Sequence, residues 1–365
     1  MKPHLLIIRF SALGDVLMSV PVIDALARQY PDMRITVVSR PYVGPVMRML
    51  PENVSFVGVN LKNYKGLGGL RCLFKELKAL QPTAVADFHN VLRTIWLRFF
   101  FQLNGIKTAY LNKDRLQRKK FITAAVKTQQ CTSFEGYQQV LAKLGFPVRI
   151  DWHQPFSLFG NISQSGMSIS AKTNSPAETD IQSGSNSQQE EKIFAKENAI
   201  GVAPFAAHQG KIYPLDKMEQ VVAKLSEKTH VYLFGAGTEE KALMEEWERK
   251  YPNVESVVGR LADMGEELCL MSRLRVVLAM DSGNMHLASL AGVPVVSVWG
   301  ATHPLGGFLA WGQSMENVIQ EDLPCRPCSI YGSKPCRYGD YRCLTRISPE
   351  RIVTAISKLV NWKIG

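Results

Sequence analysis

The first half of this chain alternates short apolar runs with stretches of helical apolar spacing, and this alternation most constrains its fold. The helical spacing predicts helices from Val16 to Gln29, from Gly69 to Leu80 and from Ser133 to Leu144. The apolar runs predict strands at Leu5–Ile8, Ile35–Val38, Ser55–Val59 and Ala84–Phe88. Repeated strand–helix units of this kind build a parallel sheet that is covered by helices on both faces.

A second alternating unit follows a segment of very different composition. Residues 161–191 consist mainly of Ser, Asn, Gln, Thr, Ala and Gly, and such a segment has too few large apolar side chains to order itself. The second unit begins at Ala199. We expect two doubly wound, Rossmann-like α/β domains that face a central ligand-binding cleft. The expected divisions are a domain at 1–159, a flexible insertion at 160–197, a second domain at 198–347 and a C-terminal helix within 348–365.

The chain is strongly basic. It has 43 Lys and Arg against 32 Asp and Glu, a formal net charge of +11 and a pI near 9.3. This balance favours an anionic partner, whether a nucleic acid, an acidic membrane surface or a phosphorylated small molecule. We expect no membrane span, because no run of eighteen apolar residues occurs. We also expect no signal peptide, because Met1, Lys2 and Pro3 lead straight into the first predicted strand. We therefore expect a cytoplasmic protein that can contact a membrane surface.

Asp15 follows the first predicted strand, in a short turn at the start of a helix. Ligands of open α/β sheets collect at the carboxyl ends of the strands. A carboxylate at this position can accept a proton from a substrate, or it can cap the helix that follows. The turn alone does not decide between these two roles.

The second half contains a similar junction after the strand predicted at Val276–Met280. Asp281, Ser282 and Gly283 follow it, and the next helix begins at once. Backbone N–H groups and a hydroxyl at a helix N-terminus suit a phosphate or diphosphate. His286 lies in the first turns of this helix. Its side chain has two interpretations, a structural hydrogen-bonding role and ligand binding.

Two further strand–helix junctions carry candidate ligand groups. Lys211 stands in a glycine-containing loop and can offset diphosphate charge, although most lysines are simply solvated surface residues. The segment Gly235–Glu240 resembles a dinucleotide-binding loop. Glu240 occupies the position of the last glycine of that fingerprint, so a nicotinamide-dependent dehydrogenase is disfavoured.

Taken together, these motifs resemble glycosyltransferase family 9, the heptosyltransferase family of lipopolysaccharide core assembly. The order and spacing of the motifs across both halves make the resemblance specific, and it covers most of the chain apart from the low-complexity segment. The matching segments are Arg9–Val16 with Pro21, Lys211–Pro214, Gly235–Glu240 and Asp281–Ala288.

The resemblance implies a GT-B fold and an inverting, metal-independent transfer from a nucleotide-activated sugar, ADP-heptose above all. By matching position, Asp15 would be the general base on the acceptor hydroxyl. The implied donor-binding residues are Lys211 on the phosphate, Glu239 or Glu240 on the ribose, Asp281 on the sugar, Ser282 and Gly283 on the diphosphate, and His286.

The resemblance also implies an anionic, lipid-linked saccharide of the lipopolysaccharide inner core as the acceptor. Arg93 would meet an acidic sugar or a sugar phosphate. The implied acceptor-binding residues are Ser11, Gly14, His89, Asn90 and Arg93. The partners expected on this basis are the nucleotide sugar, the acceptor and the cytoplasmic face of the inner membrane, with no nucleic acid.

Four of the seven cysteines are clustered near the end of the chain. Cys325, Cys328, Cys336 and Cys343 resemble a four-thiolate zinc knuckle, although the second pair does not have the usual spacing. A structural zinc site and a reduced, packed loop are the two interpretations. No metal or other cofactor is expected to be needed for the transfer itself.

Two alternatives to a glycosyltransferase remain open from the sequence. One is a GT-B-fold sugar-nucleotide epimerase. The other is a non-catalytic protein that binds a sugar nucleotide or a nucleic acid through the basic, Tyr-containing loop around the clustered cysteines. The combination of Asp15, Lys211 and Asp281 favours the enzyme.

Overall fold

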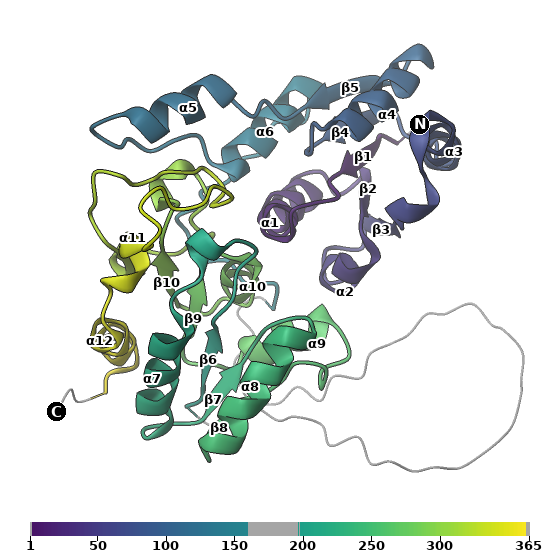
Figure 1. Ribbon diagram of the computed structural model, residues 1–365. Coiled ribbons are helices and arrows are strands. Elements are labelled where there is room, and N and C mark those ends of the chain that lie inside the picture. Colours follow the sequence, from purple (N-terminus) through teal and green to yellow (C-terminus); the bar gives the residue numbers. More distant parts are fainter. Residues whose placement is uncertain (1, 160–195, 197, 363–365) are drawn as a thin grey trace, which may run out of the picture.

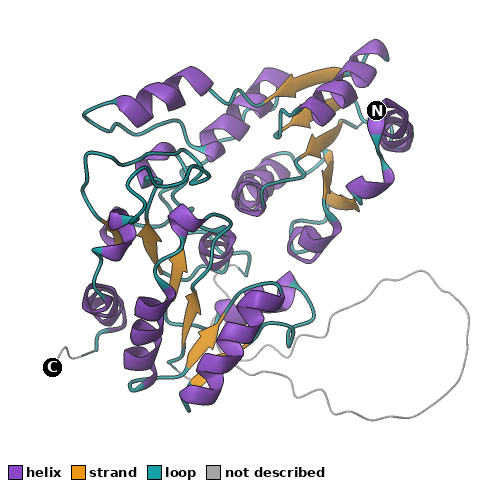
Figure 2. Cartoon of the chain, viewed as in Figure 1, coloured by secondary structure: helices purple, strands orange, loops and turns teal. Residues whose placement is uncertain are grey.

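Two parallel β-sheets, each with helices on both faces, make up the protein (Figures 1 and 2). The computed structural model describes residues 2–159, 196 and 198–362. The insertion predicted at 160–197 therefore lies outside the described residues, except for Lys196 near its end. The predicted α/β class, with two Rossmann-like domains, is confirmed.

The N-terminal sheet has five parallel strands in the order β3-β2-β1-β4-β5. Its strands are β1 (His4–Ile8), β2 (Arg34–Ser39), β3 (Val54–Gly58), β4 (Ala84–Asp87) and β5 (Lys107–Tyr110). Its helices are α1 (Leu13–Gln29), α2 (Gly44–Met47), α3 (Gly66–Ala79), α4 (Leu92–Leu103), α5 (Arg115–Thr123) and α6 (Ser133–Leu144).

Strand β1 shows why both faces of this sheet are covered. Successive side chains of a strand point to opposite faces. Leu5 and Ile7 belong to the apolar cluster that contains α1 and α6, whereas Leu6 and Ile8 belong to the cluster that contains α3 and α4. A strand that is buried on both sides is expected to be a nearly continuous apolar run, as β1 is from Leu5 to Ile8.

The C-terminal sheet has six parallel strands in the order β11-β10-β9-β6-β7-β8. Its strands are β6 (Ile200–Ala203), β7 (Val231–Leu233), β8 (Val254–Ser256), β9 (Val277–Met280), β10 (Val295–Trp299) and β11 (Val318–Gln320). Its helices are α7 (Leu215–Ser226), α8 (Thr238–Lys250), α9 (Met264–Met271), α10 (Gly283–Leu290), α11 (Arg342–Thr345) and α12 (Pro349–Val360). Helices α9 and α10 share the cluster of one sheet face, and α7, α8 and α12 share that of the other.

The two domains meet through helices α1 and α10, which lie side by side between the sheets in Figure 1. Two glycines permit this close approach. A methyl group at Gly14 would lie 2.8 Å from the ring of His286, and one at Gly283 would lie 2.8 Å from the side chain of Leu13. The starts of both helices are therefore held at the contact between the domains.

Residues 151–159, predicted to belong to the N-terminal domain, contact both domains. The ring of Trp152 stacks on Phe134 of α6, with centroids 6.1 Å apart. Leu158 donates a backbone hydrogen bond to Leu290 (2.9 Å), and Trp311 donates through its indole nitrogen to the Gln154 carbonyl (2.8 Å). In the described part of the chain, no helix is long and apolar enough to cross a membrane.

Candidate active site between the domains

Asp15 lies in the first turn of α1, directly beyond the carboxyl end of β1. Its Oδ2 is 2.5 Å from Nη2 of Arg9, and 20% of its side chain is exposed. The backbone carbonyl of Asp15 accepts a hydrogen bond from the Tyr137 hydroxyl (2.9 Å). Asp15 makes no side-chain capping bond to α1. The buried Arg9 guanidinium thus fixes a partly accessible carboxylate at the start of the helix.

The loop after β4 brings His89 to the same edge of the sheet. His89 Nε2 lies 3.2 Å from the hydroxyl of Ser11, which precedes α1. Burial and the nearby Arg9 lower the pKa of His89 to about 3, so its imidazole is neutral at pH 7. Ser11, Asp15 and His89, predicted together on the acceptor side, are therefore neighbours.

Asn90 has a structural role that the sequence did not predict. It adopts a left-handed backbone conformation, with φ of 47°. Its side chain donates to the Leu111 carbonyl (2.8 Å) and accepts from Arg98 (3.1 Å). Asp87 accepts from the backbone N–H groups of both His89 and Asn90 (2.9 and 2.8 Å). Its other oxygen lies 2.9 Å from Nε of Arg98. Asn90 and Arg98 hold this loop in shape.

Cationic side chains surround this acceptor-side group. The pKa of Lys113, just after β5, is lowered by burial and by the nearby charges of Arg9, Arg115 and Arg118. Arg93, at the start of α4, and Lys113 both act electrostatically on His89. Lys113 and Arg118 also line a surface pocket beside α5. The result is a positively charged rim close to Asp15.

On the C-terminal domain, partly buried Lys211 forms an ion pair with buried Asp281. Lys211 Nζ lies 2.9 Å from Oδ2 of Asp281, and the same oxygen accepts from the Thr302 hydroxyl (2.7 Å). Lys211 ends a short 3₁₀ turn after β6, whereas Asp281 and Thr302 follow β9 and β10. Because the carboxyl ends of parallel strands share one edge of a sheet, these three residues meet there.

Ser282 and Gly283 form the start of α10, as predicted. Ser282 is the N-cap, but its side chain makes no capping bond, and its buried hydroxyl has no hydrogen-bond partner. His286 lies one turn further on, against Gly14 of the other domain. Burial lowers the pKa of His286 to about 4, against opposing effects of Asp281 and Asp15. A neutral imidazole thus lies within electrostatic reach of both carboxylates.

The glycine loop after β7 gives its two glutamates different surroundings. Glu240 accepts a hydrogen bond from the backbone N–H of Ala236 (2.8 Å), and burial raises its pKa. Glu239, in the first turn of α8, is exposed. Glu240 therefore shapes its own loop, and Glu239 is the carboxylate left free to meet a ligand.

The clustered cysteines are not arranged as a four-thiolate metal site, which was one of their two interpretations. Cys325, Cys328, Cys336 and Cys343 are free thiols, and the described residues include no group of three or more His, Cys, Asp or Glu placed to hold a metal ion. Their loop instead packs beneath the Lys211 site. Arg326 donates to the Thr302 carbonyl (2.8 Å).

Three residues that organise the site were missed from the sequence: Arg98, Tyr137 and Thr302. Thr302 follows the strand next to β9, so its place at the carboxyl edge could have been found from the strand order. Arg98 and Tyr137 lie on helices and reach the site only through tertiary packing. Tyr137 stacks on Phe88, with ring centroids 4.3 Å apart.

A family model supports the resemblance inferred from the motifs. The model for glycosyltransferase family 9 (heptosyltransferase) matches residues 70–340. Among curated proteins, lipooligosaccharide heptosyltransferase 2 of Campylobacter jejuni is 23% identical over 164 residues, which are 44% of this chain and 51% of that protein. This alignment thus spans about half of the relative's length.

Solved structures of similar fold extend over the whole chain. The family 9 glycosyltransferase of Veillonella parvula has a TM-score of 0.69 at 17% identity and covers 100% of this chain and 99% of its own. The ADP-heptose lipopolysaccharide heptosyltransferase II of Escherichia coli has a TM-score of 0.66 at 18% identity, with 99% of both chains covered. At these identities the likeness is one of fold.

Proposed function

Because the chain belongs to glycosyltransferase family 9, the heptosyltransferase family, we propose that it transfers a sugar from a nucleotide-activated donor. The proposed donor is ADP-heptose, and the proposed acceptor is an anionic, lipid-linked saccharide of the lipopolysaccharide inner core. One observation carries the proposal. Asp15 lies in the first turn of α1 in one domain, whereas the Lys211–Asp281 pair and the start of α10 belong to the other. Helices α1 and α10 are in contact, so the two groups meet at one interface.

In this proposal Asp15 removes the proton from the acceptor hydroxyl. Arg9 holds one carboxylate oxygen in place, and a carboxylate at this position can accept the proton of a substrate hydroxyl. The deprotonated oxygen attacks the anomeric carbon from the face opposite the leaving diphosphate, and the configuration at that carbon is inverted. His286 and His89 are neutral at pH 7, so neither adds positive charge that competes for the Asp15 carboxylate.

The leaving diphosphate is stabilised by the C-terminal domain. Lys211 supplies a positive charge, and Asp281 with Thr302 fixes the place of its ammonium group. The Ser282 hydroxyl and the N–H groups at the start of α10 supply hydrogen-bond donors, and donors of this kind suit phosphate oxygens. These groups fill the role that a divalent cation has in other transferases, which supports a metal-independent transfer.

The same arrangement suggests where the remaining parts of both substrates bind. Glu239 is proposed to meet the donor ribose, since it is exposed at the start of α8 beside the glycine loop. Arg93, Lys113 and Arg118 are proposed to meet the anionic acceptor at the rim close to Asp15. A lipid-linked acceptor would place the protein at the cytoplasmic face of the inner membrane, and this location stays a prediction.

The proposal is tested by release of nucleoside diphosphate from ADP-, GDP- and UDP-sugars, each with and without a panel of inner-core saccharides. We expect release from ADP-heptose that depends on an acceptor and persists in EDTA. Release without any acceptor but with epimerised sugar would favour the epimerase. Tight donor binding without release under any condition would favour a non-catalytic binding protein.

A further inference from the structure

Helix α4 exposes a continuous apolar face, although it belongs to the surface of the N-terminal domain. Its inward face contains Leu97 and Phe101, which are buried against the sheet. Its outward face repeats apolar residues at helical spacing, and most of them are substantially exposed. They are Leu92 (72% exposed), Ile95 (44%), Trp96, Phe99 (45%) and Leu103 (68%), which we call the α4 stripe.

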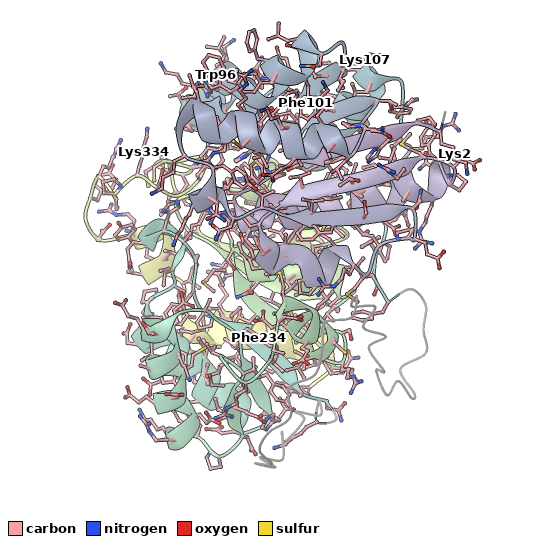
Figure 3. All side chains as sticks on the ribbon, turned by 90° about the vertical axis from the view of Figure 1, so that its right-hand side faces the viewer. Lys2, Trp96, Phe101, Lys107, Phe234 and Lys334 are labelled. Atoms are coloured by element: carbon pink, nitrogen blue, oxygen red, sulfur yellow. The ribbon has the colours of Figure 1, made fainter. Side chains whose placement is uncertain are left out.

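The exposed apolar residues of α4 are not interleaved with acidic side chains. The helix contains no Asp or Glu, and its outward face would be expected to be polar in a helix that faces only water. A contiguous exposed apolar patch of this kind marks an interaction surface. Figure 3 shows Trp96 at the upper edge of the N-terminal domain, far from Phe234 of the C-terminal domain. The α4 stripe thus faces away from the contact between the domains.

Basic residues border the α4 stripe on the side of helix α3. Rings of Phe74 and Phe100 lie 5.5 Å apart, and Lys78 reaches Asn104 at the end of α4 (2.6 Å). Residues three or four apart share one face of a helix. The exposed Arg71 therefore lies on the row of α3 that also holds Phe74 and Lys78, beside α4.

The chain around the α4 stripe is also strongly cationic. Residues 88–130 include nine Lys or Arg and one acidic residue, Asp114. Helix α5 in this segment presents Lys119 and Lys120 to solvent, together with Leu116, which is 76% exposed. Apolar side chains bordered by cations on the α3 side match a surface that is apolar inside and negatively charged at its boundary, as an anionic bilayer is.

We propose that the α4 stripe docks the protein onto an anionic phospholipid bilayer, with Trp96 and Phe99 in the interface and the α3 cations on lipid phosphates. The position relative to the site fits this occupant. The stripe begins at Leu92, three residues after His89, so a saccharide anchored in the same bilayer would reach the acceptor side of the site directly. The biological purpose of this docking rests on the proposed function, whereas the binding of the α4 stripe to a bilayer does not.

The test is cosedimentation of the full-length protein with phosphatidylglycerol–phosphatidylcholine vesicles and with phosphatidylcholine vesicles. We expect binding to the anionic vesicles that weakens as salt is raised. The double variant Ile95→Asn/Phe99→Asn should lower the partition coefficient at least about tenfold, because two apolar side chains no longer enter the lipid. Both positions are exposed, so folding should be unaffected. The matched control is Met315→Asn, an apolar residue that is 43% exposed on the C-terminal domain.

A second readout uses Trp96 itself. Brominated phosphatidylglycerol should quench part of the tryptophan emission of the wild type, and Trp96→Phe should remove that part. Arg71→Gln/Lys78→Gln, which removes the two α3 cations beside the stripe, should reduce binding to anionic vesicles and leave the weak binding to phosphatidylcholine unchanged.

Several outcomes would overturn the docking proposal. One is equal vesicle binding by the wild type and the Ile95→Asn/Phe99→Asn variant. Another is a dimeric wild type that this variant makes monomeric without a change in vesicle binding, because the stripe would then join two copies of the chain. Failure of the proposed function would give a different result from failure of the docking proposal. Vesicle binding would still depend on the α4 stripe, but no nucleoside diphosphate would be released from any sugar donor.

Discussion

Two aspartates in this protein have different surroundings, and those surroundings separate their roles. Asp281 is 5% exposed, and a single oxygen receives both the Lys211 ammonium and the Thr302 hydroxyl. Asp15 is 20% exposed and is held by Arg9 alone. Asp281 is therefore suited to position Lys211, whereas Asp15 can be reached by a substrate hydroxyl. The sequence placed both after strands but did not show their exposure.

Substitution of Lys211 tests the diphosphate side of the site. Lys211→Ala should weaken ADP binding about 10- to 100-fold, because a hydrogen bond to a charged partner contributes roughly 1.5–3 kcal/mol. Isothermal titration calorimetry measures this directly. The matched control is Lys217→Ala, since Lys217 on α7 contacts only backbone carbonyls near α11. Unchanged ADP affinity in the Lys211 variant would remove this residue from the phosphate site.

Candidate residues were predictable where they directly follow a strand. Asp15, Lys211 and Asp281 were found in this way, and the structure places each at the carboxyl edge of its sheet. The detailed role of Asn90 could not be predicted, because its side chain bonds to Leu111, just after β5, and to Arg98 of α4. Contacts of this kind depend on how separate elements pack, and one sequence does not specify them.

At the scale of elements, helix α4 is the clearest omission from the sequence prediction. Its apolar residues occupy both the inward and the outward face, so no single apolar stripe signals an amphipathic helix. Strand β5 was missed as well, because Lys107–Tyr110 is short and lies at the edge of the sheet, where one neighbour suffices. In contrast, α6 begins and ends as predicted, with a capping box from Thr132 and a left-handed Gly145 after its last residue.

Helix α9 contains Glu267, a residue with a marked expected pH dependence of stability. Burial and the neighbouring Asp263 raise the pKa of Glu267 from 4.5 to about 7. Between pH 4.5 and about pH 7, the native state keeps this carboxyl group protonated, whereas the unfolded chain releases the proton. The free energy of unfolding therefore falls as pH rises through this range. The Glu267→Gln variant lacks this ionisation. Its stability relative to the wild type should increase from pH 4.5 to pH 7, by on the order of 1–3 kcal/mol.

Denaturant unfolding of both proteins at several pH values measures this difference. The matched control is Glu246→Gln, an exposed position on α8 that should show no such trend. A constant difference between Glu267→Gln and the wild type across this range would show that Glu267 titrates normally.

At the scale of the whole molecule, the site is divided between two domains that each fold around their own sheet. The proposed base comes from α1, and the proposed diphosphate site comes from the loops around α10. Gly14 and His286 bring these helices into contact, so the carboxylate and the cation are held on opposite sides of one interface. Neither domain alone contains both groups, and this division explains why the transfer would require the complete chain.

The most direct test of this account is the effect of Asp15→Asn on turnover and on donor binding, measured in the same preparation. The substitution keeps the shape of the side chain and removes its basicity. We predict that acceptor-dependent ADP release falls about 10²- to 10⁴-fold, the usual contribution of a general base, while the affinity for ADP stays within about twofold. Asp24→Asn, at another Asp–Arg pair on the same helix, should retain wild-type turnover. An Asp15→Asn enzyme that turns over at the wild-type rate would contradict the assignment of Asp15 as the base.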